Sequence, residues 1–133
     1  MTTETIHSTV LIVDDQQFAR DLARRTLTNL GYVSVLDAGD GEAALDIVRQ
    51  AKPEIIVCDI NMQPMSGFQF LSELRAMPAP LRDLPVILLT AHTDEAFVRK
   101  ARELKVARYL LKSEMISRLD MAIRQVLSAR VED

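Results

Sequence analysis

The stretch IIVCDINMQPMSG, residues 55–67, decides the fold of this chain. It begins with four apolar residues, the run ends at the acid Asp59, and the turn residues Pro64 and Gly67 follow. A short apolar run bounded by turn residues is typical of a strand that is buried on both faces of a parallel sheet. Asp59 would then lie at the carboxyl end of a central strand. In open parallel α/β sheets this edge is where ligands bind.

Apolar runs and helical patterns alternate along the rest of the chain. Strands are expected at residues 9–13, 32–36, 55–58, 85–89 and 107–111. Apolar residues at a spacing of about 3.6 predict a helix after each strand. Strict alternation of buried strands with helices predicts one α/β domain, in which a parallel five-stranded sheet is covered by helices on both faces.

The ends and inner faces of these helices follow from the same patterns. Gly31 closes the first helix, Pro53 stops the second, and the fourth begins near Asp94. The first helix is expected to turn one apolar face to the sheet, formed by Phe18, Ala19, Leu22, Ala23, Leu27 and Leu30. The last is expected to do the same with Ile116, Leu119, Ile123, Val126 and Leu127.

Length and composition favour a single cytoplasmic domain. The chain has 133 residues, a net charge of −3 and one cysteine, Cys58. This charge gives no general case for nucleic-acid binding, and no apolar run approaches the roughly 18 residues of a membrane helix. The polar start does not resemble a signal peptide, and a lone cysteine fits a reducing compartment. We expect a flexible terminus at residues 1–8, one domain at residues 9–130 and no output domain.

Polar side chains stand at the carboxyl ends of four of the five expected strands: Asp14, Asp15, Asp59, Thr90 and Lys112. In a parallel sheet these ends share one edge, so the five groups should converge, and only the second strand adds nothing obvious. Adjacent carboxylates raise one another's pKa unless a cation lies between them. Oxygen ligands without His or Cys favour Mg²⁺. A carboxylate nucleophile, a divalent metal, an ammonium and a hydroxyl together indicate a phosphoryl-transfer site that forms an aspartyl phosphate.

Four motifs resemble the receiver domain of two-component response regulators: VLIVDD at residues 10–15, DINM…PMSG at 59–67, LLTA at 88–91 and YLLK at 109–112. Each motif is weak alone, but the four occur in order at strand ends and cover nearly the whole chain. The resemblance implies a flavodoxin-like (βα)5 three-layer sandwich with the strand order 2-1-3-4-5, which receivers are known to share. It also implies a bacterial phosphoprotein similar to the stand-alone chemotaxis receivers.

The resemblance assigns roles to the residues at this edge. Asp59 would be the phosphoacceptor. Asp15 and Asp59 would bind Mg²⁺ together with the backbone carbonyl of Asn61, and Asp14 would act mainly through a metal-bound water. Lys112 would contact the phosphoryl group.

The resemblance also implies a switch. Thr90 would be pulled toward the phosphoryl group after transfer, and Tyr109 would turn inward as Thr90 moves. The phosphoryl group would then favour one of two pre-existing conformers. Asn61 and His92 would flank the route of the water that removes the phosphate.

Three positions depart from the pattern of the family. Ser113 follows the lysine where most receivers have proline; a cis bond before serine costs roughly 2.5–4 kcal/mol, so a trans bond is expected. Gln63 stands where proline is commonest, and Pro64 comes one place later. The turn before the last strand, residues 104–106, lacks the usual glycine, so the fourth helix is expected to end differently.

The expected function is that of a stand-alone receiver. It would take phosphate from a histidine kinase or a phosphotransfer protein and would then control binding to a downstream protein. It would assist only its own phosphorylation and dephosphorylation, so we do not expect an enzyme for an external substrate. A true aspartyl-phosphate hydrolase generally has a general acid two residues after its nucleophile, and Asn61 cannot serve there. The alternative is a degenerate receiver that binds proteins independently of phosphorylation.

One basic stretch stands out against the acidic balance. Its positive charges are opposed only by Glu103 and come from Arg99, Lys100, Arg102, Lys105, Arg108 and Lys112. A solvated helix face is one interpretation. The other is a docking surface for an acidic partner or a phosphorylated ligand such as a nucleotide, with Arg99, Arg102, Lys105 and Arg108 as its candidate residues.

Overall fold

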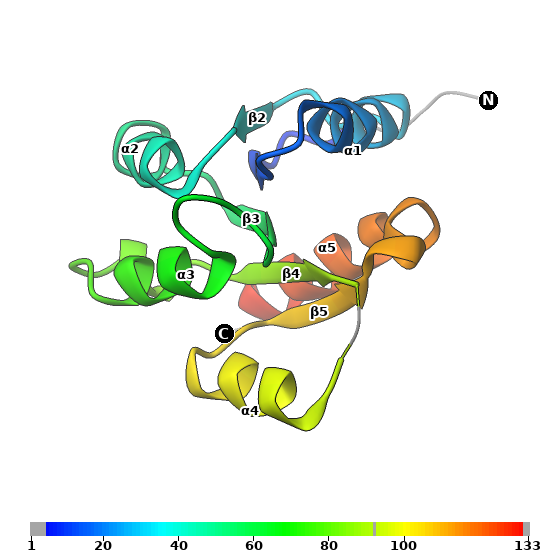
Figure 1. Cartoon of the computed structure of the whole chain (residues 1–133). Helices are drawn as coiled ribbons and strands as arrows, with labels where there is room; N and C mark the ends of the chain where they lie inside the picture. The colour runs from blue at the N-terminus through cyan, green and yellow to red at the C-terminus, as the bar shows by residue number, and fades with distance from the viewer. Residues whose placement is uncertain (1–4, 92, 132–133) are drawn as a thin grey trace.

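The computed structural model describes residues 5–91 and 93–131 and contains one sheet of five parallel strands (Figure 1). The strands are β1 (Val10–Val13), β2 (Val35–Ala38), β3 (Ile55–Asp59), β4 (Val86–Thr90) and β5 (Arg108–Leu111). They are ordered β2-β1-β3-β4-β5 in the sheet. The flavodoxin-like order that the family resemblance implied is therefore confirmed.

Helices follow the strands throughout the described residues. The α-helices are α1 (Gln17–Asn29), α2 (Gly41–Ala51), α3 (Gly67–Arg75), α4 (Glu95–Glu103) and α5 (Met115–Val131). Two short 3-10 helices are η1 (Leu81–Asp83), in the connection between α3 and β4, and η2 (Lys112–Glu114), directly after β5.

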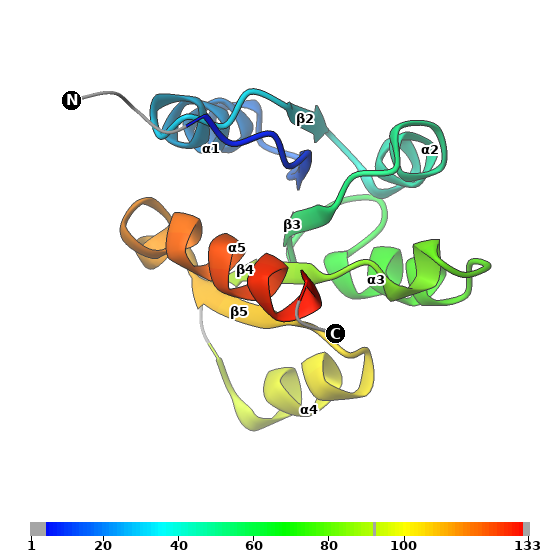
Figure 2. The ribbon, with the colours of Figure 1, turned by 180° about the vertical axis from the view of Figure 1, so that it is seen from behind.

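These helices cover both faces of the sheet. On one face Leu27 of α1 and Leu119 of α5 pack in a common core with Val10. On the other, α2, α3 and α4 form a second core, in which Phe70 lies with Leu11. Figure 2 shows α5 in front of β4 and β5, on the side away from α4. Because both faces are covered, β1, β3 and β4 are buried along their whole length, which explains their continuous apolar runs.

The predicted inner faces of the first and last helices are wrong at the helix ends. Phe18, Leu30 and Ile116 are 80%, 39% and 62% exposed, whereas Leu27 and Leu119 are fully buried. Phe18 and Ile116 are the second residues of their helices, and Leu30 follows the last residue of α1. Helical periodicity assigns a residue to a face, but it does not reveal whether the sheet extends far enough to cover that residue.

The second strand begins three residues later than predicted. It comprises Val35–Ala38 instead of residues 32–36, and Val35 pairs with Val10 of β1. Tyr32 lies outside this strand: its side chain is buried in the core with Leu27 and Leu119, and its backbone forms an isolated parallel bridge with Ile6. The flexible terminus at residues 1–8 stays a prediction, although Ile6 takes part in this bridge. Gly31, which lies between the end of α1 and Tyr32, has a φ of 104°, a backbone conformation that glycine adopts without strain.

The other boundaries agree with prediction within one residue. Pro85 and Ala107 lie just outside β4 and β5, while Asp59 and Thr90 are the last residues of β3 and β4. The fourth helix begins after Asp94, as predicted, and the Asp94 carboxylate caps it.

The side chain of Tyr32 links the connection between α1 and β2 to α5. Its side chain is 2% exposed, and its hydroxyl donates to Oδ1 of Asp120 at 2.7 Å. Burial, followed by the hydrogen bond to Asp120, raises the pKa of Tyr32. The folded protein therefore keeps this proton at a pH at which the unfolded chain loses it.

Tyr32→Phe is expected to lower the free energy of unfolding by about 1.5 kcal/mol at neutral pH, because it removes a hydrogen bond to a charged group. Above about pH 10 an unfolded tyrosine ionises, so the wild type loses stability through Tyr32 as the pH rises and the difference between the two proteins narrows. Urea unfolding at neutral and alkaline pH measures both effects. Tyr109→Phe, at a ring that is 42% exposed, is the control. Equal losses in the two variants would contradict the prediction.

Candidate functional site

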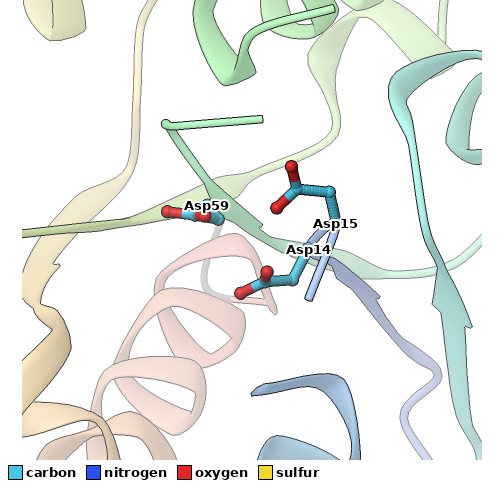
Figure 3. A group of neighbouring side chains, drawn as sticks. All are labelled: Asp14, Asp15 and Asp59. Atoms are coloured by element: carbon cyan, nitrogen blue, oxygen red, sulfur yellow. The ribbon is translucent and has the colours of Figure 1, made fainter. Parts of the chain in front are cut away.

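Three carboxylates meet at the carboxyl ends of β1 and β3 (Figure 3). One carboxylate oxygen from each of Asp14, Asp15 and Asp59 lies within 4.8 Å of the other two. Asp59 is 1% exposed and Asp14 is 4% exposed, while Asp15 is half-buried. The structure thus brings together the three acids that the sequence places at strand ends.

Parallel pairing explains this placement. Val13 of β1 lies opposite Cys58 of β3, so Asp14 and Asp59, each one residue further along, leave the paired strands side by side. Cys58 itself is buried, and burial raises the pKa of its thiol well above the usual value, so it stays protonated beside the acids.

The loop after β3 is held against this edge. The Gly67 amide donates to the carbonyl of Ile60 at 2.8 Å and closes the loop on itself. The Gln63 amide donates to Oδ2 of Asp15 at 3.2 Å. The loop therefore links the end of β3 to the acid that follows β1. Asn61 lies within it and is exposed.

The negative charge of these acids is only partly compensated within the described residues. Burial raises the pKa of Asp14, the hydrogen bond from the Gln16 amide lowers it, and the charge of Asp59 raises it further. Both oxygens of Asp59 and Oδ1 of Asp15 are buried and, apart from an ion pair of Asp59 with Lys112, have no polar partner in the described chain. Buried oxygens of this kind call for a partner, and oxygen ligands alone suit a hard cation. The residues present therefore fit Mg²⁺.

Lys112 and Thr90 reach the site from the neighbouring strands. Lys112 directly follows β5, and its Nζ lies 3.0 Å from Oδ1 of Asp59. Thr90 is the last residue of β4 and is 4% exposed. Asp59 pairs with Leu89, and Thr90 pairs with Leu111, so the ends of β3, β4 and β5 lie at one edge.

The two turns that depart from the family pattern keep this geometry. The cis peptide bonds in the described chain are Gln63–Pro64 and Ala79–Pro80, so the bond before Ser113 is trans, as expected. With Ser113 in η2, Lys112 still contacts Asp59. After α4, Lys105 adopts a φ of 57°, in the left-handed region that favours glycine. The chain thus makes at Lys105 the turn for which most receivers use glycine.

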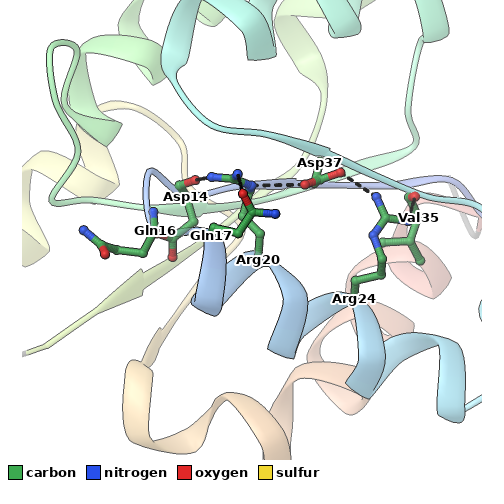
Figure 4. Close-up of polar contacts among 7 residues, drawn as sticks. All are labelled: Asp14, Gln16, Gln17, Arg20, Arg24, Val35 and Asp37. Atoms are coloured by element: carbon green, nitrogen blue, oxygen red, sulfur yellow. Dashed lines mark hydrogen bonds and ion pairs between the residues drawn. The ribbon is translucent and has the colours of Figure 1, made fainter.

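Sequence reasoning missed a basic clamp behind the acids (Figure 4). Arg20 of α1 donates through Nη1 to the backbone carbonyl of Asp14 at 2.7 Å and through Nε to Oδ2 of Asp37 at 3.0 Å. Arg24, one turn later, also binds Asp37 and donates to the carbonyl of Val35 at 2.6 Å. The second strand, which was expected to add nothing obvious, supplies Asp37 to this clamp. The signal available in the sequence was the pair Arg20 and Arg24, four residues apart on one helix face, together with the acid Asp37 in an otherwise apolar run.

The predicted basic surface is divided in the structure. Arg99 and Arg102 are exposed on α4. Lys105 and Arg108, which follow α4, instead line a groove with Arg75 and Arg82. Another predicted residue, His92, lies outside the described residues.

Comparisons with known proteins agree with this geometry. The profile of the response regulator receiver domain matches residues 10–124. The chain is 37% identical over 120 residues to a probable chemotaxis protein CheY of Rhizobium etli, covering 90% of this chain and 92% of that protein. It is 33% identical over 119 residues to the transcriptional regulatory protein PdtaR of Mycobacterium tuberculosis, covering 90% of this chain and 56% of PdtaR. The solved structure of Vibrio cholerae chemotaxis protein CheY4 superposes with a TM-score of 0.83 at 28% identity, covering 91% and 99% of the two chains.

The chain belongs to the receiver domain family of two-component response regulators. It spans nearly the whole length of the chemotaxis relative but only about half of PdtaR, at 56%. Within residues 5–91 and 93–131, no helix combines the length and the apolar character that crossing a membrane requires.

Proposed function

We propose that this protein accepts a phosphoryl group on Asp59 from a histidine kinase or a phosphotransfer protein and then changes its binding to a downstream protein. One observation carries the proposal. The buried Asp59 forms an ion pair with Lys112 at 3.0 Å, and its carboxylate lies in the same 4.8 Å cluster as those of Asp14 and Asp15. An acceptor carboxylate, a pair of acids for a cation and an ammonium are the parts of a phosphoryl-transfer site.

The residues around Asp59 have complementary tasks in this chemistry. Asp15, Asp59 and the backbone carbonyl of Asn61 would hold Mg²⁺, with Asp14 acting through a water. When bound, the ion supplies positive charge that offsets the charge of the phosphoryl oxygens. An Asp59 oxygen forms the new bond to phosphorus, the bond from phosphorus to the donor nitrogen breaks, and its electron pair leaves with the donor imidazole. Lys112 stabilises the negative charge of the transferred group.

The signal would then pass from Thr90 to Tyr109. The Tyr109 ring is 42% exposed and packs edge-on against Phe97 of α4, with ring centroids 5.3 Å apart and an interplanar angle of 86°. If the Thr90 hydroxyl moves toward the phosphoryl group, it leaves room behind it for the ring of Tyr109. An inward turn of Tyr109 ends its contact with Phe97 and changes the surface of α4. The switch would then be read by a partner that docks on α4.

Besides Lys100 and the acids Glu95 and Glu103, α4 carries two arginines, Arg99 and Arg102. Both side chains are exposed, and charge complementarity steers association with an oppositely charged surface. We infer that the downstream protein offers an acidic surface to α4. In an experiment with that protein, Arg99→Glu with Arg102→Glu should weaken binding and reduce its dependence on salt; unchanged affinity and salt dependence would remove the inference.

The central test is phosphorylation by acetyl phosphate, followed by the mass of the intact protein. The wild type should gain one phosphoryl group only when Mg²⁺ is present, and Asp59→Asn should gain none. Asp46→Asn, at an exposed acid on α2, is the matched control and should behave as the wild type. Failure of the folded wild type to gain mass would favour a degenerate receiver that acts only by protein contacts.

Arg20→Ala is expected to weaken Mg²⁺ binding about tenfold, because Arg20 fixes the backbone of a residue beside the metal and partners of this kind contribute 10–100-fold. Arg24→Ala is the control, since Arg24 shares Asp37 but makes no hydrogen bond to Asp14. Calorimetric titration with Mg²⁺ and urea unfolding should be run on both variants. If the two variants have equal Mg²⁺ affinities and equal stabilities, Arg20 contributes to the stability of the fold and not to the Mg²⁺ site.

A further inference from the structure

A groove of about 730 Å³ lies at the edge of the sheet opposite Asp59. Pro85 and Ala107, the residues just before β4 and β5, line it, so it is at the amino ends of these strands. Asp59 and Lys112 lie at the carboxyl ends. The groove is therefore separate from the phosphorylation site proposed above, and neither inference depends on the other.

Positive charge dominates the lining of this groove. Among the described residues, the lining contains one acid, Asp83, and four cationic side chains, namely those of Arg75, Arg82, Lys105 and Arg108. Arg82 approaches Asp83 only at 4.0 Å. Lys105 and Arg108 have no carboxylate within 4.0 Å among residues 5–91 and 93–131. This local excess contrasts with the net charge of −3 of the whole chain.

Arg75 builds the walls of the groove. Its guanidinium donates to the backbone carbonyls of Arg82 at 2.9 Å and Leu84 at 2.7 Å, on the connection before β4. It also donates to the carbonyls of Leu104 at 2.9 Å and Lys105 at 3.1 Å, in the turn after α4. One half-buried side chain thus joins the two segments that carry the other three cations. These four hydrogen bonds go to uncharged carbonyl groups, while burial lowers the pKa of Arg75 and the nearby charge of Asp83 raises it.

An apolar floor lies beside these cations. Leu84 and Val126 are 7% and 9% exposed and both line the groove, together with Pro85 and Ala129. Gln125 of α5 adds an amide that can both donate and accept. Cations next to an apolar surface suit an anion with an organic part, and the volume is within the range of small-molecule sites.

We propose that this groove binds a small organic phosphate of nucleotide size. Arg82, Lys105 and Arg108 would hold the phosphate, and the organic part would lie on Leu84 and Val126. Guanidinium groups bind phosphate oxygens through paired hydrogen bonds. A phosphate monoester also carries more negative charge than a single carboxylate, which suits a site with three cations.

Adenosine monophosphate is the probe, titrated into the ¹⁵N-labelled full chain with EDTA present, so that Mg²⁺ cannot carry phosphate to the carboxylates. Saturable amide shifts are expected around Lys105 to Arg108 and at Leu84. Arg82→Gln with Arg108→Gln should weaken binding at least about tenfold. Arg99→Gln with Arg102→Gln removes two charges outside the groove and should leave the affinity unchanged. Arg75 is kept in both variants because its loss threatens the fold.

Adenosine and citrate distinguish the chemistry of the ligand. Weaker binding of adenosine and of citrate than of the probe would support an organic phosphate. Equal binding of citrate would overturn the assignment in favour of a general acidic partner, such as a carboxylate-rich peptide. Shifts that do not saturate, shifts confined to the region of Asp59, or equal weakening by the two double variants would overturn the site.

Discussion

Gly67→Ala is expected to lower the free energy of unfolding by about 3 kcal/mol and to slow phosphorylation at Asp59. A Cβ at this position would stand 2.4 Å from the backbone carbonyl oxygen of Asp59 and 2.8 Å from Cα of Ile60. Both neighbours are backbone atoms of the strand end that carries the acceptor, so relief of the clash must move Asp59 itself. Urea unfolding and the rate of phosphorylation by acetyl phosphate measure the two effects.

Gly41→Ala is a closely matched control. Gly41 and Gly67 are each the first residue of a helix, and the side chain of the preceding residue caps that helix. Both substitutions therefore gain the same helix propensity from replacing glycine with alanine. A Cβ at Gly41 would also meet an atom at 2.4 Å, but that atom is the sulfur of Met65, at the flexible end of a side chain. Gly41→Ala should therefore stay close to wild-type stability and rate. If both variants lose the same stability, the clash with the backbone of Asp59 is not the cause.

Lys112→Met is expected to slow phosphorylation about 100-fold while it tightens Mg²⁺ binding. The slower reaction follows from the loss of an ammonium that stabilises the transferred group. The tighter Mg²⁺ binding follows because a cation now 3.0 Å from Asp59 no longer repels the metal. Rates at saturating Mg²⁺ separate the two effects, since the higher affinity cannot then hide the slower step.

Lys100→Met provides the reference for the loss of one positive charge on an exposed surface. It should change neither the rate nor the Mg²⁺ affinity appreciably, because Lys100 lies on α4 and not at the acids. Weaker Mg²⁺ binding in Lys112→Met would mean that Lys112 positions the carboxylates. An unchanged rate would remove Lys112 from the proposed chemistry.

The position of the acids could be predicted because it depends on strand ends alone. Asp59 follows a run of apolar residues, and in a parallel sheet every such end lies at the same edge. The strand order could not be worked out in that way and came from the family resemblance. The clamp of Arg20 on Asp14 also escaped prediction, because it depends on how α1 lies over β2 and on where β2 begins, and that boundary was three residues off.

The basic residues show the limit of reasoning along the chain. Arg99, Arg102, Lys105 and Arg108 are neighbours in sequence, and the prediction treated them as one surface. In the structure Lys105 and Arg108 line a groove with Arg75 and Arg82, which come from the end of α3 and from η1. Nothing in the local sequence of Arg75 and Arg82 indicates this, since their proximity results from the folding of the connection before β4.

The separation of charge between the two edges of the sheet makes the protein electrostatically asymmetric. Acids gather where β1 and β3 end, and the cations of the groove lie where β4 and β5 begin, so the small net charge conceals opposite charges at the two edges of the sheet. In the field of a charged partner such a molecule is turned before it touches, and fewer encounters are wasted in the wrong orientation. A phosphoryl group on Asp59 would add negative charge at one pole only. Modification would then alter the approach to a partner as well as the surface that the partner meets.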